Sequence, residues 1–175
     1  NGHQPMFDIS KRYIVVFNGE IYNFIEIKNE LVKKGYAFRS SSDTEVLLNA
    51  YIEWGTQCVL RFNGMWSFAI WDSTKKELFL SRDRFGKKPL FYSDINEKFI
   101  FASEMKAIYP FLNKVDASKD FQWMKKNVFL YESTEKCLID GIKRFPQGSN
   151  GIYRNGKLKI YRYWNTLDNL HDTPQ

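Results

Sequence analysis

The sequence predicts a domain of the α+β class, in which helices and antiparallel strands share one core. Two segments with helical spacing follow an early apolar strand, and the pattern then changes to strands arranged as hairpins. At 175 residues the chain has room for one domain with a sizeable core. Its hydrophobic content of 43%, against 26% charged residues, is typical of a folded protein.

The first elements are expected to be a strand and a helix. The apolar run YIVVF at 13–17 predicts the strand. The following helix is predicted over 23–34, with Asn23 as its cap, Glu26 completing a capping box and Gly35 at its exit. Its expected buried stripe is Phe24, Ile27 and Leu31.

A second helix follows a short extended piece. Ser42 and Glu45 have the spacing of another capping box, and Gly55 ends the helix. Its expected inward-facing residues are Val46, Leu47, Ala50, Tyr51 and Trp54.

Four strands are expected to follow as two hairpins. The first pair is predicted at 65–72 and 77–83 around a polar turn, and the second at 89–94 and 98–103. The stretch WSFAIW is almost continuously apolar, which suggests a strand covered on both faces, by a second sheet or by a helix layer.

The remaining elements are shorter. A short helix over 103–111 is expected to stop at Pro110, and the mixed segment 113–135 is expected to be helical around 121–126. The pair Asn155-Gly156 between alternating arms predicts a hairpin. Residues 165–175 are polar and predict a linker or tail.

Composition narrows the function classes. No apolar run approaches the ~20 residues that cross a bilayer, and the first residues lack the pattern of a signal peptide, which predicts a cytoplasmic protein without a membrane partner. Cys58 and Cys137 are too few for a disulfide framework and lack metal-ligand spacing, so buried thiols and no metal site are expected. The net charge of +6 keeps nucleic acid in consideration, but the basic residues are scattered.

The pair Asn18-Gly19 offers two hydrogen-bond donors after the first strand. The Asn18 amide and the Gly19 backbone N–H could point at one atom, and the missing side chain of Gly19 allows close approach. Two such donors make a plausible oxyanion hole. The alternative is an ordinary turn, which this dipeptide alone favours.

Acidic residues near the helix starts also allow two interpretations. Glu20, Asp43 and Glu45 can serve helix capping and the helix dipole, and for Glu45 this is the favoured interpretation. If Ser42 provides the cap, the Asp43 carboxylate remains available for a cation such as an ammonium group. The spacing alone leaves the two interpretations of Asp43 evenly balanced.

The order of the motifs resembles a known family. His3-Gln4-Pro5-Met6, NGEIYN, SDTEV, FNGMWSFAIWD, RDRFGKKPL and FASEMKAI occur collinearly over residues 3–111. Together they are similar to the glutamine amidotransferase domain of glutamine-hydrolysing asparagine synthetases, the class II amidotransferases. A looser similarity continues through IDGIKRFPQGSNGIYRNGKLKIYRYW.

The resemblance implies a fold and a chemistry. The fold is the four-layer α/β/β/α N-terminal-nucleophile hydrolase fold, with two stacked antiparallel sheets. An N-terminal cysteine of the family attacks the side-chain amide of glutamine, with its own α-amino group as base, and releases glutamate and ammonia. Asn18 and Gly19 would form the oxyanion hole, and Glu20 and Asp43 would hold the α-ammonium group of glutamine.

The resemblance also implies that the domain is incomplete at its N-terminus. The cysteine and the arginine that receives the glutamine α-carboxylate lie upstream of the HQPM motif in the family, so this chain is expected to be inactive alone. Residues 1–164 are expected to form the glutaminase domain and 165–175 a linker toward an ATP-dependent synthetase domain. ATP and Mg²⁺ would belong to that domain, with aspartate as acceptor, no cofactor would bind here, and a homodimer is left open.

Two other functions remain as alternatives. The missing nucleophile permits a non-catalytic interaction module that keeps the fold. A nucleic-acid binder would use exposed aromatics such as Phe91 and Tyr92 beside the basic RDRFGKK stretch. The alternation of those aromatics is that of core strand positions, which speaks against the nucleic-acid binder.

Overall fold

Two antiparallel sheets form the frame of the molecule. The computed structural model describes residues 2–95, 97–127 and 134–169. The larger sheet has the order β1 (Met6–Phe7), β2 (Tyr13–Ile21), β3 (Gly64–Asp72), β4 (Glu77–Arg82), β8 (Ser149–Arg154) and β9 (Lys157–Arg162). The smaller sheet has the order β6 (Lys98–Ala102), β5 (Phe91–Ile95) and β7 (Lys143–Arg144).

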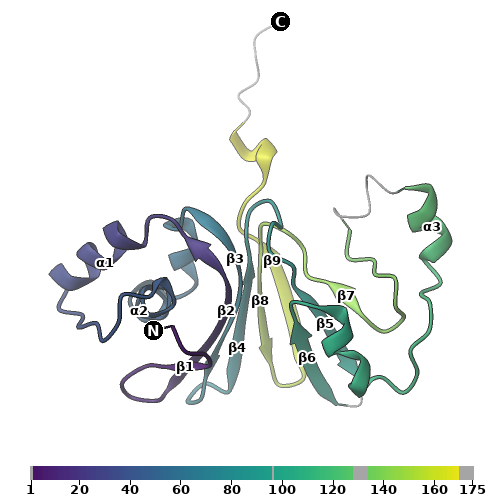
Figure 1. The fold of residues 1–175 in the computed structure, drawn as a ribbon, viewed down its shortest axis with the longest axis horizontal. Helices are drawn as coiled ribbons and strands as arrows, with labels where there is room; N and C mark the ends of the chain where they lie inside the picture. Colours follow the sequence, from purple (N-terminus) through teal and green to yellow (C-terminus); the bar gives the residue numbers. More distant parts are fainter. Residues whose placement is uncertain (1, 96, 128–133, 170–175) are drawn as a thin grey trace, which may run out of the picture.

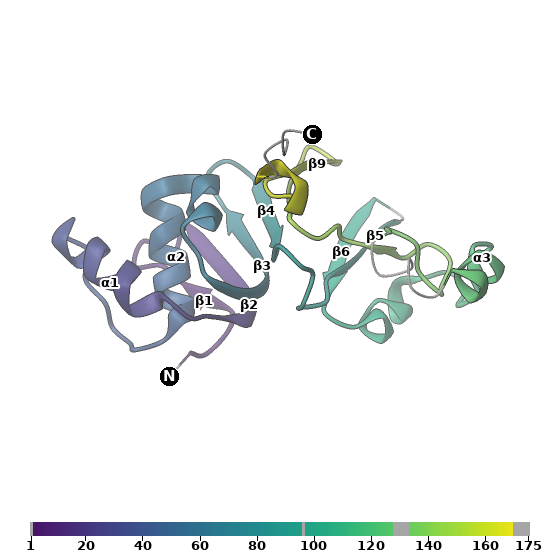
Figure 2. The same cartoon turned by 90° about the horizontal axis from the view of Figure 1, so that it is seen from above.

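Helices cover the outer faces of both sheets. The α-helices are α1 (Phe24–Lys33), α2 (Asp43–Trp54) and α3 (Phe121–Lys126), and the 3₁₀ turns are η1 (Gly55–Leu60), η2 (Met105–Ala107), η3 (Tyr109–Phe111) and η5 (Thr166–Asn169). Figures 1 and 2 show α1 and α2 on one side of the large sheet and the small sheet on the other. The order of layers is helix, sheet, sheet and short helical turns, which confirms the four-layer α+β prediction.

Three apolar clusters fill the spaces between these layers. The first lies between α1, α2 and the large sheet and includes Leu31, Leu47 and Phe79. The second lies between the sheets around Leu80 and Phe145. The third covers the outer face of the small sheet with residues of η2 and η3. Burial of these side chains is the main stabilising contribution, at roughly 25 cal/mol per Å² of apolar surface.

The central strand β3 is covered on both faces, as predicted. All five residues from Trp66 to Ile70 are at most 3% exposed. Trp66, Phe68 and Ile70 belong to the cluster under the helices, whereas Ala69 belongs to the cluster between the sheets. The alternation of side chains along a strand assigns each set to its face.

The two long helices begin where the sequence predicts, but their caps differ from the prediction. Ser42 caps α2, because its Oγ accepts the N–H of Thr44 at 3.1 Å. Asn23 precedes α1 without capping it, since its side chain instead binds the backbone of Arg61 and Asn63. The predicted capping box at Asn23 is therefore wrong.

Glu45 does not complete the second capping box either. Its carboxylate accepts hydrogen bonds from Arg39 N–H and from the N–H and hydroxyl of Ser40. Burial alone would raise the pKa of Glu45, but these hydrogen bonds outweigh it and lower the pKa. Glu45 therefore stabilises the loop before α2.

Two further expectations need correction. Strand β2 continues to Ile21, four residues beyond the predicted strand, so Asn18 and Gly19 lie inside it. The helix expected over 103–111 consists of η2 and η3, and Pro110 lies inside η3, where the first turn tolerates proline. Residues 166–169 of the expected tail form a 3₁₀ turn, and 170–175 lie outside the described residues.

Several other predictions are confirmed. Helix α3 occupies the predicted residues, although 128–133 of the mixed segment lie outside the described part. Asn155 and Gly156 have φ values of 51° and 72°, as a type I′ turn between β8 and β9 requires. In the part of the chain described here, no helix combines the length and hydrophobicity needed to cross a membrane.

Candidate active site

The position of Gly19 in β2 leaves no space for a side chain. Gly19 pairs with Trp66 of β3. A β-carbon on Gly19 would lie 2.3 Å from the carbonyl oxygen of Met65 and 2.8 Å from the Cα of Trp66. Both are backbone atoms, so glycine is required here by the close approach of two strands rather than by a turn. The turn interpretation of Asn18-Gly19 is therefore wrong.

The backbone N–H of Gly19 points toward the edge of β2 that faces away from β3. Trp66 directs both of its peptide groups toward Asp83: its N–H donates to the Asp83 carboxylate at 3.3 Å, and its C=O accepts the Asp83 N–H at 2.8 Å. Gly19 and Trp66 are therefore a non-hydrogen-bonded pair of the antiparallel ladder. Both peptide groups of Gly19 consequently face the opposite edge.

On this edge of β2, the two neighbouring N–H groups donate hydrogen bonds to side chains. Phe17 N–H donates to Gln4 Oε1 at 2.6 Å, and Ile21 N–H donates to Asp43 Oδ2 at 3.1 Å. Between them, the Gly19 N–H has no hydrogen-bond acceptor among the described residues. The edge of the strand thus offers one open donor, flanked by two that are already used.

The Asn18 side chain lies on the face of β2 that is turned toward the small sheet. Its Nδ2 donates to Ser103 Oγ, just after β6, at 3.0 Å. Asn18 and Ser103 line a cavity of about 400 Å³ between the sheets, together with Gln4 and apolar residues such as Phe101. The bond to Ser103 uses one of the two amide hydrogens, and the second remains for another acceptor.

Asp43 reaches the same strand from the start of α2. Ser42 caps the helix, as the sequence predicts, and the Asp43 carboxylate turns toward β2. One of its oxygens binds Ile21 N–H, and among the described residues the other has no partner. Asp43 therefore stabilises the link between α2 and β2 while retaining a free oxygen for a cation.

A cleft of about 560 Å³ brings three of the four predicted site residues together. Gly19, Glu20 and Asp43 line it, with Ser42 and Lys88. Glu20 is exposed, and no described residue forms a hydrogen bond or ion pair with its carboxylate. Asn18 lies in the adjoining cavity between the sheets rather than in this cleft.

Lys88 is a cleft residue that sequence reasoning missed. The RDRFGKK loop that carries it is fixed by Asp83, whose carboxylate accepts the N–H groups of Phe85, Lys87 and Lys88. The sequence did contain a signal for this loop: an acidic residue, Asp83, stands at the end of a buried strand and is followed at once by a glycine-containing loop. In such a loop a carboxylate commonly binds the backbone N–H groups that follow.

Arg82, the residue before this loop, fixes it from the other side. Its guanidinium donates to the carbonyls of Gly86, Lys88 and Phe145, each at 2.8 Å. The side chain is only 3% exposed. A buried guanidinium that binds three carbonyls holds the loop, and with it Lys88, in one conformation.

Neither cysteine belongs to the site. Cys58 lies in η1 with no exposed surface, and burial raises its pKa far above that of a free thiol. Cys137 is 2% exposed, and burial raises its pKa to about 11. Thiols of this kind are protonated at neutral pH and are poor nucleophiles. Their burial confirms the expectation from the sequence.

The nucleic-acid alternative loses its basis in the structure. Phe91 and Tyr92 are 9% and 6% exposed and belong to the clusters on the two faces of the small sheet. Bases stack on exposed aromatic rings, and these two rings are covered. The alternative is therefore wrong for the residues on which it was built.

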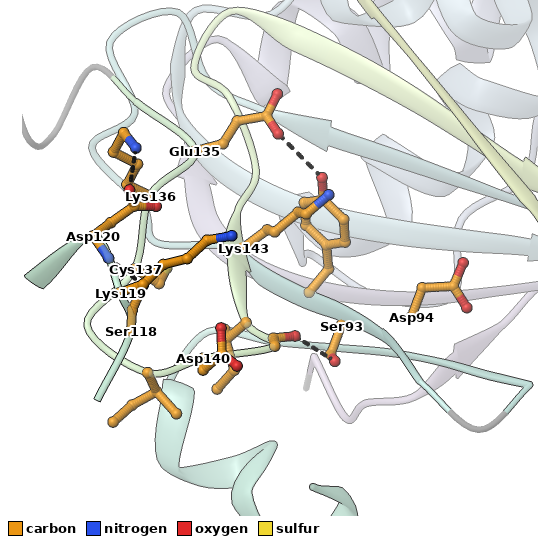
Figure 3. Close-up of a pocket in the computed structure, with 14 residues that line it drawn as sticks. Ser93, Asp94, Ser118, Lys119, Asp120, Glu135, Lys136, Cys137, Asp140 and Lys143 are labelled. Carbon is orange, nitrogen blue, oxygen red and sulfur yellow. Dashed lines mark hydrogen bonds and ion pairs between the residues drawn. The ribbon is translucent and has the colours of Figure 1, made fainter. Parts of the chain in front are cut away.

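A separate pocket of about 390 Å³ lies beside the small sheet (Figure 3). It contains none of the predicted site residues. An ion pair joins Lys136 to Asp120 at 2.5 Å, and the Tyr92 hydroxyl donates to Glu135 at 3.4 Å. In the described ranges, no three His, Cys, Asp or Glu side chains gather into a possible metal site.

Sequence comparisons identify the family to which the chain is similar. The profile of a family described as the glutamine amidotransferase domain matches residues 1–164. Asparagine synthetase [glutamine-hydrolyzing] 3 of Bacillus subtilis is 37% identical over 174 residues, covering 97% of this chain and 28% of the relative. Asparagine synthetase [glutamine-hydrolyzing] 1 of the same organism is 42% identical over 167 residues, covering 94% and 26%. The chain thus spans about a quarter of these relatives.

Solved structures share the fold. A glutamine phosphoribosylpyrophosphate amidotransferase from B. subtilis, complexed with ADP and GMP, aligns with a TM-score of 0.65 and 19% identity, covering 92% of this chain and 32% of that one. A glutamine aminotransferase class-II domain protein from Silicibacter pomeroyi aligns with a TM-score of 0.57 and 13% identity, covering 87% and 68%. Fold and family profile agree, and the chain belongs to the class II glutamine amidotransferase domains found in asparagine synthetases.

Proposed function

We propose that this domain binds L-glutamine and hydrolyses its side-chain amide, so that the ammonia can be used to amidate aspartate in an ATP-dependent reaction. The observation that supports this most directly is the open N–H of Gly19, which lies in a cleft with the carboxylates of Glu20 and Asp43. The N–H donor suits the side-chain amide oxygen at one end of glutamine, and the two carboxylates suit the α-ammonium group at the other end.

Each residue has one role in the proposed reaction. The amide oxygen of glutamine accepts hydrogen bonds from Gly19 N–H and Asn18 Nδ2, which stabilise the negative charge that develops when the carbonyl is attacked. The free oxygen of Asp43 and the carboxylate of Glu20 hold the α-ammonium group. These contacts fix the substrate so that the reacting carbonyl stays at the edge of β2.

The nucleophile is proposed to be a cysteine that precedes residues 1–175, because Cys58 and Cys137 are buried away from the cleft. Its thiolate attacks the carbonyl carbon, the C–N bond breaks, and the nitrogen leaves as ammonia after receiving a proton. Water then hydrolyses the thioester to glutamate and regenerates the thiol. The free α-amino group of an N-terminal cysteine can carry the proton in both steps.

The remaining partners follow from the same proposal. The relatives are named as glutamine-hydrolysing asparagine synthetases, and this chain covers only 28% and 26% of them, so we propose that ATP and Mg²⁺ bind to a synthetase domain outside residues 1–175. Two cysteines without a disulfide suit the reducing cytoplasm.

A non-catalytic interaction module is the second candidate, and the burial of both cysteines favours it. The two proposals differ in the reading frame that encodes the chain. A cysteine codon directly after the initiating methionine, upstream of Asn1, supports the enzyme. A frame that begins at Asn1 supports the interaction module.

Ligand binding tests the cleft on this chain directly. We expect backbone NMR signals of Gly19, Glu20 and Asp43 to shift on titration with L-glutamine. Glutaric acid monoamide, which lacks the α-ammonium group, should shift the Asp43 signal much less. Equal shifts with both ligands, or shifts confined to the pocket of Figure 3, would contradict the assignment.

A further inference from the structure

The FASEMKAI motif, residues 101–108, contributes one residue, Ser103, to the candidate site. The proposed function by itself gives Ser103 no role. Ser103 follows β6 directly and is half-buried. Its Oγ accepts the Nδ2 hydrogen of Asn18 at 3.0 Å. The two residues are 85 positions apart, with Asn18 in the large sheet and Ser103 directly after the last strand residue of β6, so this bond links the two sheets at the candidate site.

We propose that Ser103 is a positioning residue that holds the Asn18 amide with its Nδ2 available to the substrate oxygen. This inference rests on the proposed function, because it gives Ser103 no role unless Asn18 donates to an oxyanion. It assigns Ser103 an effect that acts through Asn18 rather than through a contact of its own with the substrate.

The geometry requires such a restraint. Asn18 is half-buried and lines a cavity of about 400 Å³, so packing alone does not enclose its amide on every side. A rotated amide would present its carbonyl oxygen to the developing negative charge and would repel it. A hydroxyl at 3.0 Å restricts the amide plane and leaves the second Nδ2 hydrogen for another acceptor.

The neighbouring side chains do not replace this restraint. Gln4 also lines the cavity, but both ends of its amide bind the backbone of Phe17, at 2.9 and 2.6 Å. Ser67 faces Asn18 across the ladder, and no side-chain bond joins the two among the described contacts. Ser103 is thus the hydroxyl that the structure places on the Asn18 amide.

Steady-state kinetics test the proposal in the full-length enzyme that carries this domain. Ser103→Ala should lower the kcat for glutamine about tenfold, the scale of one lost hydrogen bond, and leave KM unchanged. Ser103→Thr keeps the hydroxyl and should remain within about threefold of the parent. Ser93→Ala is the matched control: it removes a buried hydroxyl of the same sheet, bonded to Gly141 at 2.7 Å, and should leave kcat unchanged.

A double-mutant cycle separates this inference from the proposed function. If Ser103 acts through Asn18, the variant carrying both Asn18→Ala and Ser103→Ala should be no slower than Asn18→Ala alone. Additive losses, or an unchanged kcat in Ser103→Ala, would overturn the positioning role while the role of Asn18 stands. An unchanged kcat in Asn18→Ala would instead overturn the proposed oxyanion hole.

A measurement without catalysis completes the test. In residues 1–175, the two side-chain Nδ2 hydrogens of Asn18 should give well-separated NMR signals, because one is bound to Ser103 and the other is not. Their separation should shrink in Ser103→Ala and persist in Ser103→Thr and Ser93→Ala. Identical spectra in the parent and Ser103→Ala would contradict the bond on which the inference depends.

Discussion

Asn18 carries the sharpest prediction at the scale of single residues. In the full-length enzyme, Asn18→Ala should lower the kcat for glutamine by roughly 10²-fold or more, because one oxyanion donor is lost. Under the proposed function, synthesis from free ammonia should continue, because that reaction would take place in a domain outside residues 1–175. Kinetics with glutamine and with ammonium chloride measure both. A variant with the parent's glutamine kcat would exclude Asn18 as a donor.

Asp43 should affect binding rather than turnover. Asp43→Asn should mainly raise the KM for glutamine, because the α-ammonium contact exists in the ground and transition states alike, and an unpaired charge costs roughly 2–5 kcal/mol. The fold should survive, since an asparagine oxygen can still accept Ile21 N–H. A lowered melting temperature with an unchanged KM would instead assign Asp43 to helix stability alone.

The residue types of the site could be read from the sequence, but their surroundings could not. The cap at Ser42 follows from local spacing, whereas the same spacing left the two interpretations of Asp43 evenly balanced. The requirement for glycine at position 19 comes from Met65 and Trp66, which lie more than 40 residues away. Contacts of that range depend on strand register, and the dipeptide alone favours a turn.

At the scale of elements, the β3–β4 turn depends on one buried acid. The Asp72 carboxylate accepts the N–H groups of Thr74 and Lys75 and forms an ion pair with Arg12 at 2.7 Å. The hydrogen bond from Arg12 is the main reason that the pKa of Asp72 is lowered to about 2. Asp72 therefore joins the turn to the segment before β2.

This lowered pKa predicts how stability depends on pH. The folded pKa of Asp72 lies below the unfolded value, so its contribution is fully present above about pH 4 and is lost as the pH falls toward 2. Asp72→Asn should lower stability at pH 7 by up to about 2 kcal/mol, and less if solvent at the half-exposed Arg12 screens the pair.

Thermal or urea unfolding between pH 2 and 7 measures this effect. The Asp72→Asn variant should lack the part of the acid-dependent loss that the parent shows between about pH 4 and 2. Asp116→Asn is the control, because Asp116 pairs with Lys114 on the exposed surface and such pairs contribute little. Parallel curves for the parent and Asp72→Asn would contradict the prediction.

The elements themselves were predicted unequally well. Periodicity and turn chemistry located strands β3 to β6, the three α-helices and the Asn155-Gly156 hairpin because these signals are local, whereas the two-residue strands β1 and β7 were not predicted. The extension of β2 to Ile21 was missed, since Asn18 and Gly19 are poor strand formers on their own. Pairing with β3 along the whole of 13–21 overrides that preference.

At the scale of the whole molecule, the candidate site forms where the two sheets and α2 meet. Asn18 and Gly19 come from the large sheet, Ser103 follows the small sheet, and Asp43 begins α2. No single segment holds the site, which explains why motif order identified the family while the contacts remained hidden. The stacking of the layers is therefore what converts separate motifs into one arrangement.

The last prediction concerns the 175-residue chain by itself. It should release no ammonia from glutamine above a heat-treated control, because Cys58 and Cys137 are buried thiols with raised pKa values and lie outside the cleft. Without a nucleophile, donors and binding groups give at most weak catalysis. An enzyme-coupled assay for glutamate measures the rate, with Cys58→Ala as the matched variant. Turnover in the parent that disappears in Cys58→Ala would make Cys58 the nucleophile and would contradict a proposal that places the attacking cysteine outside these residues.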